Sequence, residues 1–249
     1  MKKQNLLFFP FLFMMGFVLF SCNVGNNGNT TNLGNVPAVV TDNTVNGAEL
    51  GTPYGYLVSP ELVTLIPGEC VYLQQFTIDY DNQPSNQYTT ITNVVQFDVN
   101  QSYVEQNDTV NIMDSSLPIS SVNGVASAYY GGNFFVLANA KDKSPSFRLV
   151  YNNTKDAADG TKNLYLLATP SSSGSSSSDI TSINAFNLLP LIQNYGRDTT
   201  VAVTSGSTAS VNLRYIMVNL NYLSAISDTG IPTYSAASQQ NPFMISIFK

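Results

Sequence analysis

The sequence predicts an all-β protein, most simply an antiparallel β-sandwich, with at most one short helix. Three observations support this prediction. Apolar and polar residues alternate along many short segments, which is the period of a half-buried strand. These segments are rich in Val, Ile, Thr, Tyr and Phe, which pack well in sheets. Gly, Pro, Asn and Asp separate them, and these residues favour turns.

Residues 1–21 have the pattern of an export signal and are not expected to belong to the fold. Lys2 and Lys3 precede an apolar run over 6–20, which is shorter than the ~20 residues of a membrane-spanning helix. The run leads into Leu19-Phe20-Ser21-Cys22. This tetrapeptide resembles the lipobox of bacterial lipoproteins, although Phe20 is larger than the residue usual at its position. The resemblance implies that Cys22 carries a diacylglycerol anchor and becomes the mature N-terminus.

The segment after Cys22 predicts how the protein is held at the membrane. In diderm lipoproteins, Asp directly after the lipidated Cys tends to retain the protein at the inner membrane. Asn23 stands there instead, so the resemblance implies an outer-membrane anchor, on either face. Residues 22–35 are rich in Asn and Gly and nearly free of apolar side chains, which predicts a flexible tether.

Residues 36–169 are expected to form a β-sandwich domain. The longest period-two pattern in it runs from Thr89 to Val99. Asn123-Gly124 lies between two alternating segments and predicts a two-residue type I′ turn. Gly131-Gly132 predicts a second turn shortly afterwards, so this region is expected to form a three-stranded meander.

Residues 170–179 (PSSSGSSSSD) predict a flexible loop or linker. Residues 180–249 then form either a second β unit or the completion of the same sandwich. The segments beginning at Glu61 and Thr199 each combine a short strand, a Gly turn and a long alternating strand. This pattern faintly resembles bacterial immunoglobulin-like domains, which implies two such units. The one expected helix is a short segment that Asp179 caps before Pro190.

Charged residues are scarce and unevenly distributed. The chain has 10 basic and 16 acidic residues, and no Lys or Arg occurs between Lys3 and Lys141. Phosphate backbones are bound by clustered basic residues, so no nucleic-acid partner is expected. The acidic excess is typical of a protein kept soluble in the envelope. An acidic surface that meets a basic partner or a cation is the alternative.

The residue types present argue against catalysis. The chain contains no His, which excludes a Ser-His-Asp triad, a Cys-His dyad and His-ligated zinc. The Ser-x-x-Lys sequence at Ser246 falls in a strand-like run, whereas serine–lysine acyl-enzymes need it at the start of a helix. A glycosidase pair of carboxylates stays open, but the sequence does not distinguish one acid from another. We therefore expect no enzyme and no cofactor besides the lipid.

Two acidic pairs are candidates for binding Ca²⁺. Asp79 and Asp81 alternate at the end of a predicted strand, and Asp156 and Asp159 lie in a predicted loop. Carboxylate oxygens are the ligands that Ca²⁺ takes, but neither pair has the spacing of a complete calcium-binding loop. Turn formation is the alternative role of these residues.

Aromatic residues around the Gly131-Gly132 turn are candidates for contacting a ligand or partner. They are Tyr129, Tyr130 and Phe134, with Asn133 beside them. Exposed rings stack on sugars, whereas cross-strand ring pairs simply stabilise a sheet. Cys70 lies in the apolar run Cys-Val-Tyr-Leu, so a buried thiol is expected there.

These observations predict a lipid-anchored protein of the cell envelope that acts as a non-enzymatic structural or protein-interaction module. Its partners are the membrane, through the lipid, and a protein of unknown identity. The alternative is an adhesin-like module that binds carbohydrate or a host surface.

Overall fold

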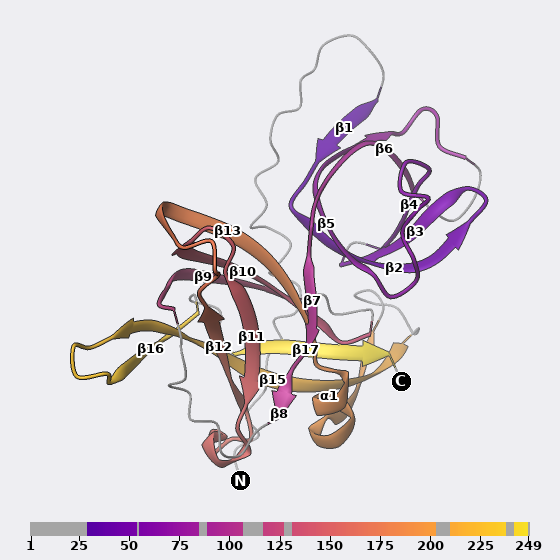
Figure 1. The fold of residues 1–249 in the computed structure, drawn as a ribbon. Coiled ribbons are helices and arrows are strands. Elements are labelled where there is room, and N and C mark those ends of the chain that lie inside the picture. Colours follow the sequence, from indigo (N-terminus) through magenta and orange to yellow (C-terminus); the bar gives the residue numbers. More distant parts are fainter. Residues whose placement is uncertain are drawn as a thin grey trace.

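The computed structural model describes residues 29–53, 55–84, 89–106, 117–126, 131–202, 210–237 and 242–248. This part of the chain is all-β with one short α-helix, as predicted. It forms two units, a closed barrel and a two-sheet sandwich (Figure 1). Within the described residues, no helix has the length and apolar character needed to cross a membrane.

The first unit is a barrel of five strands. They are β2 (Val36–Thr44), β3 (Gly47–Thr52), β4 (Gly55–Ser59), β5 (Cys70–Asp79) and β6 (Thr89–Phe97). The sheet runs β5-β2-β3-β4-β6 and closes through antiparallel pairing of β6 with β5. A five-stranded Greek-key barrel is the architecture of the OB-fold. The expectation that this region forms an immunoglobulin-like unit is therefore wrong.

The barrel closes because one set of alternating side chains fills its interior. Leu50, Leu73, Phe76 and Ile91 are almost completely buried in a single cluster. At the start of β3 the backbone of Gly47 has a φ of +116°, and a Cβ there would lie 2.2 Å from the carbonyl oxygen of Ser59. Only glycine allows this close approach.

The second unit packs two sheets face to face. The four-stranded sheet has the order β7-β13-β10-β9, and the other runs β14-β15-β12-β11-β8 with β16 and β17 also on β15. The strands are β7 (Asn100–Tyr103), β8 (Glu105–Gln106), β9 (Ile119–Ala126), β10 (Asn133–Asp142), β11 (Ser146–Tyr151), β12 (Lys162–Thr169), β13 (Ser175–Asn187), β14 (Arg197–Ala202), β15 (Ser210–Ile226), β16 (Pro232–Ala236) and β17 (Phe243–Phe248).

The sandwich has its own core and a small contact with the barrel. Phe134 and Phe186 from one sheet meet Leu149, Leu164 and Val218 from the other, all fully buried. A separate cluster joins the units, with Val39 and Cys70 from the barrel against Phe135 and Ala185 from the sandwich. Cys70 is buried, as predicted. Burial, with a smaller effect from Glu69, raises the pKa of its thiol to about 12.

The boundary between the units differs from the predicted one. Strands from both sides of 170–179 share sheets, because β10 pairs with β13 and β12 pairs with β15. Residues 180–249 therefore complete the sandwich that begins near residue 100, and the barrel ends before it. The predicted linker contributes Ser175–Asp179 to β13. The predicted tether likewise ends early, because β1 (Thr30–Leu33) pairs with β5.

Two local predictions in the sandwich are also wrong. Asn123-Gly124 is not a turn but part of β9, paired with β10. Glycine fits closely there, because a Cβ on Gly124 would lie 2.8 Å from the ring of Phe243, which would have to move. Residues after Asp179 continue β13, and the helix, α1, spans Leu189–Tyr195 instead. Pro190 lies in its first turn, where a missing backbone N–H costs no helical hydrogen bond.

Candidate functional site

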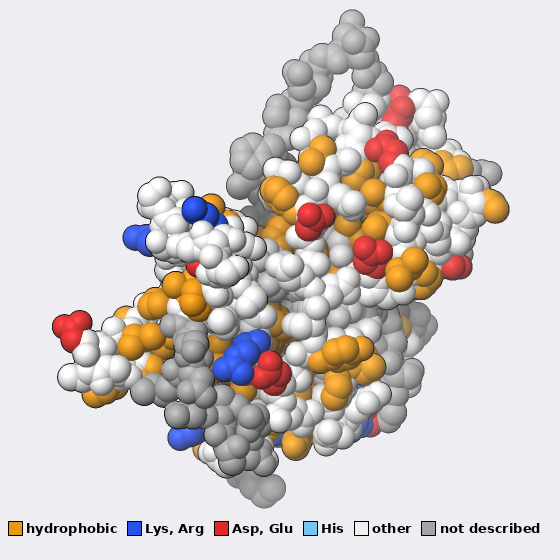
Figure 2. Space-filling view, viewed as in Figure 1, with side chains coloured by type: hydrophobic (Ala, Val, Ile, Leu, Met, Phe, Trp, Pro, Cys, Tyr) orange, Lys and Arg blue, Asp and Glu red, His pale blue; other side chains and the backbone are white. Residues whose placement is uncertain are grey.

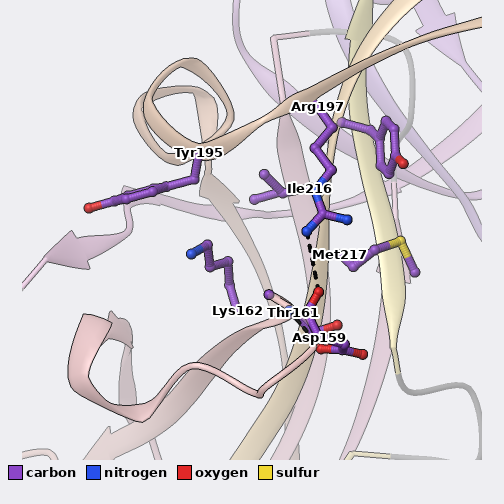
Figure 3. Close-up of a pocket in the computed structure, with 9 residues that line it drawn as sticks. Asp159, Thr161, Lys162, Tyr195, Arg197, Ile216 and Met217 are labelled. Carbon is purple, nitrogen blue, oxygen red and sulfur yellow. Dashed lines mark hydrogen bonds between the residues drawn. The ribbon is translucent and has the colours of Figure 1, made fainter.

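A small, partly open cavity lies where β14 and β12 meet end to end along β15. β14 pairs with β15 as far as Tyr215, and β12 begins its pairing at Val218. Ile216 and Met217 lie between these two partners, at a place that we call the seam. Figure 3 shows Arg197 reaching from β14 toward Asp159, with its guanidinium donating a 3.2 Å hydrogen bond to the Asp159 carbonyl oxygen.

Lys162 makes polar and cation–π contacts on the other side of the seam. Its ammonium forms an ion pair with Asp156 and lies 4.4 Å from the ring centroid of Tyr195, a favourable cation–π geometry. The same Asp156 oxygen accepts a 3.0 Å hydrogen bond from the Tyr151 hydroxyl. The rings of Tyr151 and Tyr195 meet edge to face with centroids 5.6 Å apart. These contacts fix helix α1 and the loop before β12 to the sheet.

The seam has a structural and not a chemical role. Its cavity is about 20 Å³, which is room for a single water molecule. The ammonium of Lys162 is already paired, and hydrogen bonds from Thr161 hold the pKa of Asp159 below its usual range. We therefore assign the seam to stabilising the fold. Among the described residues, the cavity beside Lys162 and Asp159 is too small for a substrate.

The two acidic pairs predicted as calcium ligands lie in separate places. Asp79 and Asp81 close the end of β5, where Asp79 accepts a 2.7 Å hydrogen bond from the side chain of Asn82. Asp81 accepts a 2.9 Å hydrogen bond from the backbone N–H of Asn29. Asp156 lies at the seam. The described residues contain no group of three or more Asp, Glu or Cys suited to a metal. The calcium site stays a prediction.

The residues predicted to contact a partner are not brought together on the surface. Phe134 is fully buried in the sandwich core, and its ring lies 5.4 Å from that of Phe243. Asn133 is also buried. Phe134 faces the opposing sheet, whereas Asn133, its neighbour along β10, is covered on the other face of the strand. Neither side chain is exposed, so contact with a partner through these two residues stays a prediction that their burial does not support. Tyr129, Tyr130 and Cys22 lie outside the described residues.

A surface feature that our sequence reasoning missed is a projecting hairpin. Beyond Tyr222, β15 pairs only with β16 among the described strands. We call residues 223–236 the arm, which extends from the sandwich on the side away from the barrel (Figure 1). Ile226 and Ile231 flank its turn and are 41% and 63% exposed. The signal was present in the sequence, because Asp228-Thr229-Gly230 separates two alternating segments.

The barrel presents a second distinctive surface. Residues 29–98 contain seven acidic residues and no Lys or Arg. Figure 2 shows red acidic side chains on the barrel without blue ones, whereas both colours occur on the sandwich. Such a surface repels phosphate and other anions. It does not have the positive groove by which proteins of this barrel type hold nucleic acid.

Comparisons with known proteins identify the fold. No protein-family model and no curated protein matches this chain. Among solved structures, an uncharacterized protein of Parabacteroides merdae is similar with a TM-score of 0.60 and 14% identity, over 85% of this chain and 96% of that chain. A predicted lipoprotein of Bacteroides fragilis has a TM-score of 0.54 and 11% identity, over 88% and 97%.

A third similar structure is a Bacteroides vulgatus protein of unknown function, DUF1344, with a TM-score of 0.51 and 13% identity, over 84% of this chain and 92% of that chain. The three similarities each extend over most of both chains. At these identities, they show a shared fold and carry no residue-level role.

Proposed function

We propose that this protein is a lipid-anchored component of the cell envelope, held at the outer membrane, that acts by binding a macromolecule and not by catalysis. The observation that carries the proposal is the position of the lipobox-like motif. Cys22 lies seven residues before Asn29, and the chain joins the barrel at Thr30. Seven residues span at most ~25 Å. A lipid on Cys22 would therefore hold the barrel close to the bilayer.

Further observations support this proposal. A structure of the same fold belongs to a predicted lipoprotein of Bacteroides fragilis. The cavity at the seam has room for a single water molecule and its Lys162 is paired with Asp156, so the seam favours binding by exposed surfaces over catalysis. The arm is such a surface, because exposed Ile side chains at the tip of a hairpin are available to a protein partner.

The test of anchoring is metabolic labelling with an alkynyl palmitate in a bacterium that processes lipoproteins. We expect label on the full chain, recovery in the outer-membrane fraction, and loss of both in Cys22→Ser. Cys70→Ser is the matched control, because that thiol is buried and should carry no lipid. An unlabelled wild-type chain that fractionates as a soluble protein would contradict the proposal.

A second candidate function is carbohydrate binding, and one observation favours it. The outer face of the four-stranded sheet carries a connected row of polar side chains. Thr181 donates a 2.6 Å hydrogen bond to Asn139, which donates a 2.8 Å hydrogen bond to Ser121. Their remaining donors and acceptors match sugar hydroxyls. A glycan array with wild type and Asn139→Ala tests this role, which fails if no glycan separates the two proteins.

A further inference from the structure

The arm has an unusual open edge. Two-stranded ribbons are marginally stable in water, yet the described part of β16 pairs with β15 alone. The arm's turn is held by hydrogen bonds of 2.9 Å from Ser227 N–H to the Ile231 carbonyl oxygen and 2.8 Å from Gly230 N–H to the Ser227 carbonyl oxygen. Farther down, the Ser224 hydroxyl donates a 3.1 Å hydrogen bond to the Thr233 carbonyl oxygen. The arm is thus an ordered projection.

The outer edge of β16 lacks the charges that usually protect exposed strands. Between Ser210 and Ala237 the described residues include two charged side chains, Arg214 near the start of β15 and Asp228 at the arm's turn. β14, another edge strand of the same sheet, begins with Arg197 and Asp198. Uncharged edges are templates for a further strand, and proteins normally block them with charge or proline. On β16, Pro232 blocks only the first position.

We propose that β16 is a self-association edge, where a second copy of this chain adds its own β16 in antiparallel orientation about a two-fold axis. A second copy fits because the strand carries no charge to repel itself. Antiparallel pairing also places the two Asp228 residues at opposite ends of the joined arms. The apolar tip of each arm, Ile226 and Ile231, then lies along the base of the other arm.

The small area of this contact means that the dimer should form mainly where the local concentration of the protein is high. Pairing of two five-residue strands buries less than the ~1,200–2,000 Å² of a stable interface, so the contact is weak in dilute solution. Two copies anchored in one membrane have a high effective concentration, which compensates for a weak contact. The high effective concentration rests on the proposed lipid anchor. The open edge of β16 does not depend on that anchor.

The experiment is thiol crosslinking on cells that produce the full chain. Thr233→Cys places an exposed thiol on β16, and Val45→Cys places one on the fully exposed turn between β2 and β3 of the barrel. Cys70 is buried and does not compete. With a short bis-maleimide, we expect at least tenfold more covalent dimer from Thr233→Cys than from Val45→Cys. Equal yields would overturn the proposal.

A charge variant separates strand pairing from chance collision. In the Thr233→Cys background, Ala236→Lys adds a positive charge to the exposed edge of β16, and we expect the dimer to fall tenfold. Thr200→Lys, on exposed β14, is the matched control and should leave the yield unchanged. Melting temperatures within a few degrees of the parent show that both variants fold. An undiminished dimer in Ala236→Lys would overturn the pairing.

A purified protein separates this proposal from the lipid anchor. Thr233→Cys combined with Cys22→Ser is crosslinked at high concentration in solution. Dimer in solution but not on cells supports the β16 contact and counts against co-anchoring in one membrane. No dimer in either setting overturns the β16 contact, whatever palmitate labelling shows for Cys22.

Discussion

The barrel and the sandwich use their few carboxylates in different ways. In the barrel, Glu61 accepts hydrogen bonds of 2.7 and 3.0 Å from the backbone N–H groups of Asn93 and Val94. β4 pairs with only the first two residues of β6. The Glu61 carboxylate therefore accepts the hydrogen bonds from the β6 backbone that a longer β4 would have accepted. In the sandwich, carboxylates meet cations, as in the 3.1 Å pair between Arg214 and Asp198. The barrel uses its acids as caps, whereas the sandwich uses some as caps and others in ion pairs.

This difference follows from where the basic residues lie. The barrel has none, so its acids can accept only from uncharged donors, which are backbone N–H, side-chain amide and hydroxyl groups. Such hydrogen bonds depend on the carboxylate and respond little to salt. Ion pairs at the surface are screened by salt. The two units should therefore respond differently to substitution, pH and ionic strength, and the predictions below use this contrast.

The largest expected effect comes from the two separate cores. Phe76→Ala in the barrel and Phe134→Ala in the sandwich each remove a fully buried ring, at a cost of about 3–5 kcal/mol of unfolding free energy. Because a small cluster joins the units, we expect hydrogen exchange to accelerate mainly in the unit that carries the substitution. Equal acceleration in both units by either variant would show that they unfold as one.

The elements themselves could be predicted from the sequence, but their pairing could not. Alternation marks β15 clearly, because that strand is half buried. It also located β6, but the single apolar face predicted there is wrong, since Ile91 is buried whereas Val95 and Phe97 are exposed. Barrel closure depends on pairing of β5 with β6 through two register shifts, and no local pattern encodes that. The serines of β13 were predicted to form a linker for a different reason. Ser175–Asp179 lie at the solvent-exposed end of the strand, where Ser175 pairs with Asp142 across an irregularity in the register and apolar burial contributes little.

The candidate site was harder to predict than the fold. Asn133 and Phe134 follow a glycine turn as expected, but which of these two neighbours faces the core depends on the opposing sheet, and here it is Phe134. The seam joins residues from a loop, a helix end and three strands, so no sequence spacing indicates it. The arm was predictable in principle, because its turn residues and exposed isoleucines are adjacent in the sequence.

The next largest expected effect on the free energy of unfolding comes from substituting Gly124, and it shows whether this residue lies in a turn or in a strand. Gly124→Ala should destabilise the sandwich by about 1–3 kcal/mol, because the added Cβ meets the Phe243 ring. Urea denaturation measures this change. The double variant with Phe243→Leu should recover part of the loss, since the smaller side chain leaves room. A strained turn at Asn123-Gly124 would instead give a loss that Phe243→Leu does not relieve.

Each unit contains a carboxylate whose pKa is lowered by hydrogen bonds, and the pH dependence of stability tests this shared feature. Hydrogen bonds from Ser171 and from the backbone N–H of Ser144 hold the pKa of Asp142 below its usual range. In the barrel, the side chain of Asn82 lowers the pKa of Asp79 in the same way. Each carboxylate therefore stabilises the fold above the unfolded pKa of ~3.9, and this contribution is lost as pH falls through the lower folded value.

We expect the melting temperature to fall between about pH 5 and pH 2, with a shallower fall in Asp142→Asn and in Asp79→Asn. Asp228→Asn, at the exposed tip of the arm, is the control and should keep the wild-type slope. If Asp142→Asn alone flattened the profile, the acidic caps of the barrel would contribute less than their geometry indicates.

The smallest effect bears most directly on the contrast between caps and ion pairs. Arg148 and Glu105 form a 3.3 Å pair that joins β11 to β8, and both side chains are at least one-third exposed. Arg148→Met should cost about 0.2–1 kcal/mol at low salt and almost nothing in 1 M salt, where the screening length is ~3 Å. Glu61→Gln removes a cap without a cation, so its cost should not change with salt. Urea denaturation of both variants at two salt concentrations compares them. A cost of Glu61→Gln that shrinks in salt as much as that of Arg148→Met would show that the barrel acids act through long-range charge and not through the hydrogen bonds to β6.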